Sequence, residues 1–202
     1  MDSCIDSEKK MMRQPLTFTG IHHLALATRD LGATIRFWRD LVGLPLFLGF
    51  GRKGYRQYFF SISESCALAF FEWPEVEALS EKDHGVPVKG PFGFDHVSIG
   101  MENDGDLARI KARLEAAGVW VSESVDHGFI HSVYTFDPNN IAVEFSSPAG
   151  SRDLRSSPVL AEKDPLPEVA EGPFPQTQLF PDPEEIPELI LYPGEGRDVV
   201  PR

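Results

Sequence analysis

The sequence predicts an α+β fold made of two βαβββ modules, whose eight strands form one cupped, mixed sheet. Two observations lead to this prediction. The first is an internal repeat, because GIHHLALATRDLGATIRFW from Gly20 and GFDHVSIGMENDGDLARIK from Gly93 show the same order of features. The second is that each copy changes from the alternating pattern of a half-buried strand to the 3.6-residue period of an amphipathic helix. His23 and His96 take the same place in the two copies.

The first module is expected over residues 18–74. Its first strand is HLALA from His23, in which leucine alternates with smaller or polar residues. Asp30 is the predicted N-cap of a helix over 31–41, and one face of this helix carries apolar residues near a 3.6-residue period: Ile35, Trp38 and Leu41. Three further strands are expected near residues 44–51, 55–62 and 66–73.

The second module is expected over residues 93–148. HVSIG from His96 is its first strand, and Asn103 or Asp104 is expected to cap the helix that follows. The inner face of this helix carries Leu107, Ile110 and Leu114, and the helix is expected to end at Gly118. Asn139–Asn140 predicts a hairpin turn, because Asn tolerates positive φ better than most residues. The remaining strands are expected near residues 119–126, 131–137 and 140–146.

Three segments lie outside the modules. Residues 1–17 are expected to form a flexible N-terminus, residues 75–92 a linker, and residues 149–202 an acidic, proline-rich and irregular C-terminal arm. From Pro148 onwards the chain holds 11 of its 17 prolines, a density that opposes regular helix or central strand. Because the same segment carries apolar residues such as Phe180, we expect the arm to pack on the core or on a partner subunit.

Composition and charge argue against several classes of protein. The net charge of -12, without a basic stripe to offset it, opposes nucleic acid as a partner. No apolar run is long enough to span a membrane, and the charged N-terminus lacks the apolar core of a secretory signal. The two cysteines, Cys4 and Cys66, predict no disulfide framework and therefore a cytoplasmic location.

Glu144 is an acid within IAVEF, an apolar run with the composition of a buried strand. An ionised carboxylate removed from water needs a cation, a proton or solvent as its partner. If the two modules are related by an approximate two-fold axis, their first strands come together. His23, His96 and Glu144 would then form a 2-His-1-carboxylate metal site, which leaves coordination positions open for substrate and dioxygen. A bound cation would also explain why Glu144 can stay ionised in an apolar strand.

These residues and their surroundings resemble the vicinal oxygen chelate superfamily, which includes glyoxalase I, extradiol ring-cleaving dioxygenases and fosfomycin or bleomycin resistance proteins. HLALATRDLGATIRFWRDLVGLP is similar to the first strand and helix of that family, DHVSIG to the start of its second module, and DPNNIAVEF to the hairpin that carries its last ligand. The resemblance covers roughly residues 18–148. It implies a divalent metal ion bound by His23, His96 and Glu144, with Fe(II) expected first and Mn, Zn or Ni as alternatives.

The stretch VDHGFIHSVYTFDPNNIAVEF resembles more closely a signature of the extradiol dioxygenases. The histidine of the signature corresponds to His127, its tyrosine to Tyr134, its acid–proline pair to Asp137–Pro138 and its ligand to Glu144. Asn140 stands where the family has Gly or Pro, and this chain has one pair of modules where the familiar extradiol enzymes have two. The resemblance implies a catechol-like substrate and dioxygen, with His127 as acid or base and Tyr134 as hydrogen-bond donor.

Two other functions stay open, a glyoxalase-like lyase or isomerase and a ligand-sequestering protein of the resistance type. Glyoxalase I has a first-module glutamate as a fourth ligand. When Pro74 is laid on Pro148, the matching position here is Phe70, and neither Phe70 nor its neighbour Ala69 can bind a metal ion. Glu72 would face the right way only if the alignment of the repeats slipped.

The remaining candidates are less firmly placed by the pattern. His131 is a rival to His127, since both flank the entry of the same strand. Phe70 and Tyr58 are expected to line a substrate pocket, and His84 is expected to be solvated in the linker. We expect a homodimer that acts on a small molecule.

Overall fold

The computed structural model describes residues 16–89, 94–176, 179–180 and 182–199. The chain forms two compact units, of which the larger comprises Thr19–Ser151 with the segment from Gly194 onwards and the smaller contains Arg152–Pro193. Of the N-terminus predicted to be flexible, residues 1–15 lie outside the described residues. Among the described residues, none of the helices is both long and apolar enough to cross a bilayer.

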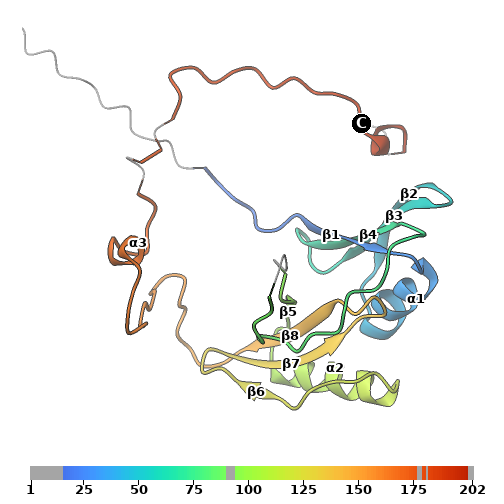
Figure 1. The fold of residues 1–202 in the computed structure, drawn as a ribbon, viewed down its shortest axis with the longest axis horizontal. Coiled ribbons are helices and arrows are strands. Elements are labelled where there is room, and N and C mark those ends of the chain that lie inside the picture. Colours follow the sequence, from blue (N-terminus) through green and yellow to red (C-terminus); the bar gives the residue numbers. More distant parts are fainter. Residues whose placement is uncertain (1–15, 90–93, 177–178, 181, 200–202) are drawn as a thin grey trace, which may run out of the picture. The chain divides into compact units, whose positions relative to one another are not determined.

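The first module is a four-stranded mixed sheet with one helical segment (Figure 1). Its elements are β1 (His23–Thr28), α1 (Leu31–Ile35), the π-helical continuation η1 (Arg36–Val42), β2 (Leu46–Arg52), β3 (Tyr55–Ser61) and β4 (Ala67–Glu72). In the strand order β1-β4-β3-β2, β1 is parallel to β4 and the other neighbours are antiparallel. The Asp30 carboxylate accepts the Ala33 N–H at 2.9 Å, which confirms the predicted N-cap.

The second module repeats this arrangement. Its elements are β5 (Val97–Gly100), α2 (Asp104–Ala116), β6 (Val125–Asp126), β7 (Ile130–Phe136) and β8 (Ala142–Pro148). The order β5-β8-β7-β6 has β5 parallel to β8 and the other pairs antiparallel. The Asn103 side chain accepts the Asp106 N–H at 3.0 Å at the start of α2. Asn140 has a φ of 57° in the turn between β7 and β8, so the predicted hairpin is confirmed.

The prediction of two βαβββ modules in an α+β fold is confirmed, and the hydrogen bonds divide the eight strands into two sheets of four. One strand is shorter than predicted. Instead of residues 119–126, β6 contains Val125–Asp126, preceded by a single bridge between Val121 and Thr135. The reason lies at Ser122, whose hydroxyl accepts the Tyr134 N–H at 2.9 Å and so replaces a backbone carbonyl in the ladder.

The two sheets share one hydrophobic core on their helix-packed faces. It contains apolar residues of the first module (Leu31, Phe37, Trp38, Phe60, Leu68 and Phe70) and of the second (Ile99, Leu107, Ile110, Leu114, Val133, Ile141, Val143 and Phe145). Because side chains alternate along a strand, the neighbours of Val133 and Val143 point the other way. We call that opposite face of each sheet, which carries Tyr134 and Glu144 in the second module, the site face.

Buried polar side chains join the modules next to this core. The Thr28 hydroxyl at the end of β1 donates to Asn139 Oδ1 at 2.7 Å, and Asn139 Nδ2 donates to Thr34 at 3.3 Å. The Trp38 indole N–H donates to the Asp137 carboxylate at 3.3 Å. Burial raises the pKa of Asp137, while its hydrogen bonds with Asn139 and Trp38 oppose that rise. The turn between β7 and β8 is therefore anchored to the first module by hydrogen bonds that are buried away from water.

This network predicts a stability effect for Thr28→Val, which keeps the shape of the side chain and removes its hydroxyl. The change leaves Asn139 Oδ1 and the Asp30 N–H without the partner that Thr28 provides. We expect the free energy of unfolding to fall by about 1–3 kcal/mol, measured by urea titration. The exposed Thr19→Val is the matched control and should change it by less than about 0.5 kcal/mol. Equal stabilities of the two variants would contradict the role of the network.

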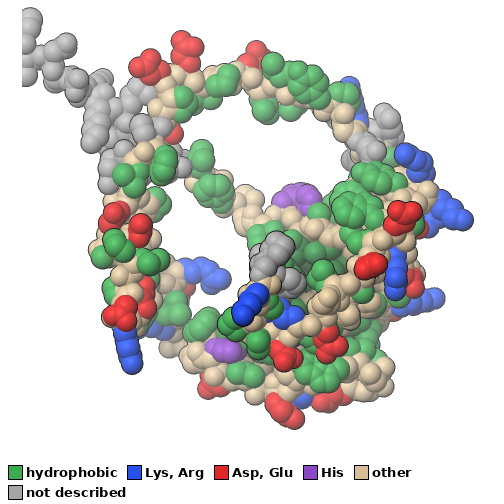
Figure 2. Space-filling model, viewed as in Figure 1, with side chains coloured by type: hydrophobic (Ala, Val, Ile, Leu, Met, Phe, Trp, Pro, Cys, Tyr) green, Lys and Arg blue, Asp and Glu red, His purple; other side chains and the backbone are tan. Residues whose placement is uncertain are grey.

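The arm has little regular structure among its described residues. The described part of Arg152–Pro193 contains the short helix α3 (Pro167–Ala170), and many of its apolar side chains are exposed, including Phe174, Phe180, Ile186, Leu189, Ile190, Leu191 and Tyr192. Hydrophobic side chains are visible along the arm in Figure 2. Further on, the short η2 (Glu195–Asp198) belongs to the larger unit, where Gly196 lies beside the Phe50 ring of β2. Packing of the arm on the core or on a partner stays a prediction.

Candidate functional site

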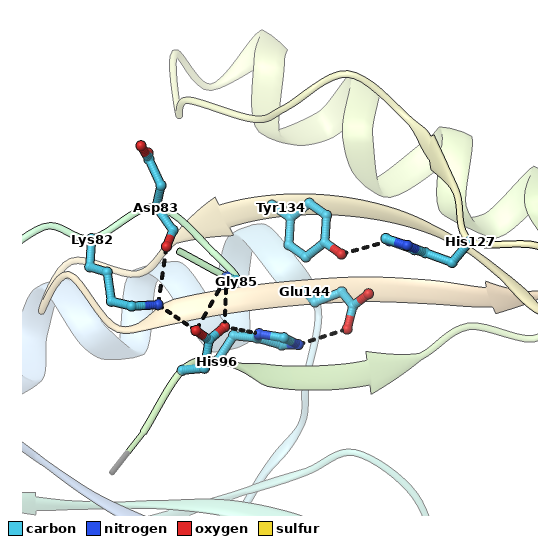
Figure 3. Close-up of polar contacts among 8 residues, drawn as sticks. Lys82, Asp83, Gly85, His96, His127, Tyr134 and Glu144 are labelled. Atoms are coloured by element: carbon cyan, nitrogen blue, oxygen red, sulfur yellow. Dashed lines mark hydrogen bonds and ion pairs between the residues drawn. The ribbon is translucent and has the colours of Figure 1, made fainter. Parts of the chain in front are cut away.

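His96 and Glu144 face each other on the site face of the second module (Figure 3). β5 and β8 are parallel neighbours, and their register places Ser98, two residues after His96, beside Glu144. His96 Nε2 lies 3.1 Å from Glu144 Oε2, and the Glu144 residue is 4% exposed. The sequence prediction that these two residues share a site is therefore matched by direct contact of their side chains.

The ring of His96 is oriented for ligation by the residue that precedes it. Asp95 Oδ1 lies 2.5 Å from His96 Nδ1, so a carboxylate accepts the proton on that nitrogen. When the ring carries that proton alone, its lone pair lies on Nε2, which faces the Glu144 carboxylate. Two electron-pair donors at this distance need a proton or a cation between them.

A metal ion fits the geometry of this pair. Two ligand atoms that bind one ion at about 2.1 Å with an angle near 90° lie about 3 Å apart, close to the separation of His96 Nε2 and Glu144 Oε2. Imidazole nitrogen and carboxylate oxygen together suit Fe, Mn, Zn and Ni. The donor set therefore accommodates a divalent transition metal without selecting one.

Glu144 is ionised in spite of its burial. Burial by itself would raise its pKa, but the nearby hydroxyls of Ser132, Ser98 and Tyr134 and the charge of His96 outweigh burial, so the pKa is lowered. The Ser132 hydroxyl is buried and makes no hydrogen bond of standard geometry. It therefore lowers the pKa of Glu144 by lying near the carboxylate. Glu144 thus carries a negative charge at neutral pH, as a metal ligand must.

Tyr134, on β7, and His127, in the turn between β6 and β7, extend the site. Tyr134 pairs with Glu144 across β7 and β8, and its hydroxyl lies 2.8 Å from His127 Nε2 (Figure 3). Burial and the negative charge of Glu144 raise the pKa of the Tyr134 hydroxyl. Tyr134 therefore keeps its proton and can donate it in a hydrogen bond, either to His127 or to a ligand.

His84 belongs to this site, although the sequence predicted a solvated residue. Its ring centroid lies 4.6 Å from that of Tyr134, 5.0 Å from that of Phe136 and 5.9 Å from that of His96. Burial lowers the pKa of His84, followed by the charge of His96. The linker folds back over the site face at this point, and no periodic pattern in the sequence signals such a path.

His131, the rival to His127, lies on the opposite face of β7. Its Nδ1 is 3.0 Å from Asp104 at the start of α2, and the hydrogen bond with that carboxylate raises the pKa of His131. The same carboxylate accepts the Ser147 hydroxyl at 2.5 Å. His131 thus joins β7 to α2, whereas its rival His127 contacts the Tyr134 hydroxyl.

His23 is not brought to the His96–Glu144 pair. It lies at the start of β1, where its Nδ1 is 2.8 Å from His22 Nδ1 and its ring is 5.5 Å from that of Phe59. Across residues 16–89 and 94–199, as far as they are described, no three His, Cys, Asp or Glu side chains are grouped to hold a metal ion. Two of the three predicted ligands meet, and the third lies apart in this single chain.

The first-module counterpart of Glu144 is Ala69. In the second module Ser98 pairs with Glu144, and in the first module the matching Ala25 pairs with Ala69. The alignment through Pro74 and Pro148 was therefore one residue out, which places Phe70 on the wrong face. Glu72 also lies on the helix-packed face, where its carboxylate accepts the Gly54 N–H at 2.7 Å and pairs with an arginine.

The two predicted substrate-binding residues also lie on the helix-packed face. Phe70 is fully buried in the shared core against Trp38 and Phe60. Tyr58 pairs with Phe70 and also packs against that core, with its ring lying across Gly49. Neither side chain lies on the site face. Phe59, which pairs with Ala69 and lies beside His23, is on the site face of β3.

A sequence model of the Glyoxalase/Bleomycin resistance protein/Dioxygenase superfamily matches residues 20–145, which is more than half of the chain. The chain belongs to this superfamily. The match spans both modules and ends just after Glu144. The superfamily resemblance predicted from HLALAT, DHVSIG and DPNNIAVEF is therefore confirmed.

Solved structures with the superfamily fold resemble the chain over about two thirds of its length. A glyoxylase/bleomycin resistance protein/dioxygenase domain from Frankia sp. EAN1pec is 20% identical, with a TM-score of 0.55, and covers 66% of this chain and 100% of its own. A glyoxalase/dioxygenase from Nostoc punctiforme is 16% identical, with a TM-score of 0.53 and coverages of 68% and 99%. A comparison with curated proteins finds no match.

These likenesses establish the fold. The superfamily name joins two groups of enzymes, the glyoxalases and the dioxygenases, with bleomycin resistance proteins. Membership therefore leaves the reaction open, and the function has to be argued from the residues of the site.

Proposed function

We propose that this protein is a non-haem Fe(II) dioxygenase of the extradiol type that acts on a catechol-like small molecule. One observation carries the proposal: the line of contacts from His127 through Tyr134 to Glu144 and His96 on one face of the second module. It places a proton-accepting ring and a protonated phenol beside a candidate metal ligand pair. A binding protein has no chemical need for that combination.

His96 and Glu144, with His23 as the third ligand, would hold the metal ion. Fe(II), when bound there, would supply Lewis acidity toward the two vicinal oxygens of a catechol and electrons for dioxygen. Fe(II) stays reduced in a cytoplasm, the location that we infer. Mn, Zn and Ni are the alternative ions.

The protein's own groups then act on the substrate. The raised pKa of Tyr134, caused by burial and by Glu144, keeps its hydroxyl protonated, so it can donate a hydrogen bond to a catecholate oxygen. His127 Nε2, at 2.8 Å from that hydroxyl, can accept a proton released by the substrate and then donate a hydrogen bond to the Tyr134 oxygen, which leaves the Tyr134 proton for the substrate. The ring of His84 covers Tyr134 and limits the access of water to this corner.

The geometry does not support a glyoxalase-like lyase. Such an enzyme needs a first-module carboxylate at the position where this chain has Ala69. Glu72 cannot take its place, because it faces the helices and is occupied by Arg56 and the Gly54 N–H. The open position would instead be available to substrate and dioxygen.

The proposal is tested by loading the protein with Fe(II) under anaerobic conditions and adding oxygen with a panel of catechols of increasing size. We expect uptake of one dioxygen per catechol without release of peroxide. Turnover of a hemithioacetal by the Zn- or Ni-loaded protein, with no oxygen uptake by the Fe(II) form, would establish the lyase instead. Tight binding of a panel member without turnover would establish a binding protein.

We also propose a homodimer, and its role in the site is testable through His23. Variants His23→Ala and Glu144→Ala should each be inactive alone. If His23 reaches the pair from a partner subunit, mixing the two variants restores up to about a quarter to a half of wild-type activity through hybrid sites. If His23 closes on the pair within its own chain, the mixture stays inactive. Sedimentation of the wild type reports the oligomeric state independently.

A further inference from the structure

Asp95 is held by groups from two parts of the chain. One carboxylate oxygen contacts His96 Nδ1 at 2.5 Å. The Gly85 N–H donates to both oxygens, at 3.0 and 3.2 Å, and the Lys82 ammonium donates to Oδ2. Lys82 and Gly85 belong to the linker, whereas His96 precedes β5. Lys82, Gly85 and Asp95 are called the linker latch below.

The charges of the latch depend on one another. The Lys82 side chain is 11% exposed, so its ammonium is mostly removed from water and needs a counter-charge. The carboxylate of Asp95 accepts from Lys82 and Gly85 on the linker side and lies against His96 Nδ1 on the other side.

We propose that Asp95 is a positioning residue that couples the seating of linker residues 82–85 to the metal-binding nitrogen of His96. The inference rests on the proposed metal site. A carboxylate that accepts the Nδ1 proton fixes both the tautomer and the rotation of the ring, and so directs Nε2 at Glu144. Because Lys82 and Gly85 hold the carboxylate in turn, the linker contributes to the preorganisation of the site.

Coupling of this kind is reciprocal. If the seated linker favours ion binding, a bound ion favours the seated linker by the same factor. His84 lies between Lys82 and Gly85 in the chain, and its ring packs on Tyr134 and His96. The latch therefore also determines whether that ring covers the site face. One carboxylate connects the ligand, the linker and the covering ring.

Mn(II) titration followed by electron paramagnetic resonance of the free ion tests the first part. We expect Asp95→Ala to weaken Mn(II) binding by about 10- to 100-fold, the range typical of residues that orient a ligand. Asp95→Asn, which can still accept a hydrogen bond from Nδ1, should weaken Mn(II) binding less than Asp95→Ala does. Lys82→Met should weaken Mn(II) binding several-fold, although Lys82 does not touch His96. The control is Asp83→Asn, which removes the same charge from an exposed neighbour and should bind like the wild type.

A second readout needs no metal. In the ion-free protein, Asp95→Ala should speed hydrogen exchange of the Gly85 amide by about tenfold or more, because that N–H loses its acceptor. The nitrogen-15 shifts of His96 should also change from a single Nδ1-protonated form to a mixture of tautomers. In the wild type, saturating Mn(II) should slow exchange over residues 82–88, and in Asp95→Ala it should not.

The outcomes separate this inference from the proposed function. If Glu144→Gln loses Mn(II) while Asp95→Ala binds it like the wild type, the metal site stands and the latch is overturned. If the wild type binds no Mn(II) but Asp95→Ala frees the His96 ring and the Gly85 amide, the metal site is overturned and Asp95 remains the residue that positions His96. Equal protection of residues 82–88 by Mn(II) in both proteins would overturn the coupling.

Discussion

Glu144→Gln is expected to abolish tight metal binding while the fold stays intact. Glutamine has nearly the same shape as glutamate, so the packing of β8 is preserved, but a neutral amide is a poor ligand and balances no positive charge. Glu144 is 4% exposed and its pKa is lowered, so the variant removes a charge that is present at neutral pH. We expect the affinity for Fe(II) or Mn(II) to fall by more than about 100-fold, beyond the loss typical of residues that only orient ligands.

The same variant distinguishes a ligand from a merely buried acid. If Glu144 were protonated in the folded protein, its replacement by glutamine would change metal content and activity very little, because glutamine is uncharged and similar in shape. Calorimetric metal titration measures the difference, and thermal unfolding of the ion-free protein reports whether the fold survives. Glu102→Gln, at an exposed position, is the control for loss of one negative charge. Wild-type metal content and activity in Glu144→Gln would reject the three-ligand site.

Tyr134→Phe and His127→Ala should behave in the opposite way, with nearly unchanged metal affinity and a large loss of turnover. Neither side chain is a proposed ligand, and the two are joined at 2.8 Å as a unit that acts on the substrate. General acid–base groups contribute typically about 10²- to 10⁴-fold, and we expect kcat to fall within that range. Because the groups act together, the double variant should lose little more than either single variant.

His131→Ala provides the contrast in the same strand. His131 contacts Asp104 on the opposite face of β7, so its loss should leave turnover near the wild-type value. Steady-state kinetics with the best catechol of the panel, at saturating Fe(II), measures all these variants together. A larger loss in His131→Ala than in His127→Ala would reverse the assignment of the two histidines. A loss of metal from Tyr134→Phe would show that the phenol supports the ligands rather than the substrate.

Local signals explain why the fold could be predicted from the sequence. Asp30 and Asn103 cap their helices as expected, because N-caps depend on a few adjacent residues. The alternation in each first strand and the repeat itself are also readable within short windows. The short β6 could not be foreseen, since it depends on the Ser122 hydroxyl meeting Tyr134 from a distant part of the chain.

The site was predictable where strand register fixes it. His96 and Glu144 are brought together by the parallel pairing of β5 and β8, which follows from the repeat. His127 follows β6, the strand that pairs with β7 and so brings it to Tyr134. Phe70 and Tyr58 were expected to line a pocket because their strands lie near the site, but a strand's position does not decide which face a side chain takes, and a shift of one residue exchanges the two faces. His84 and Asp95 were missed because their contacts depend on the path of an irregular linker.

The buried contacts between the modules have a consequence for the way the chain unfolds. Thr28 and Trp38 hold Asn139 and Asp137 across the boundary, and the helices complete a core that belongs to both modules. Neither module could exclude water from its apolar face without the other, so the two modules should unfold in one cooperative transition. The repeat that is visible in the sequence is therefore not a unit of folding. A chain cut in the linker would yield two fragments that remain folded only while they stay bound to each other.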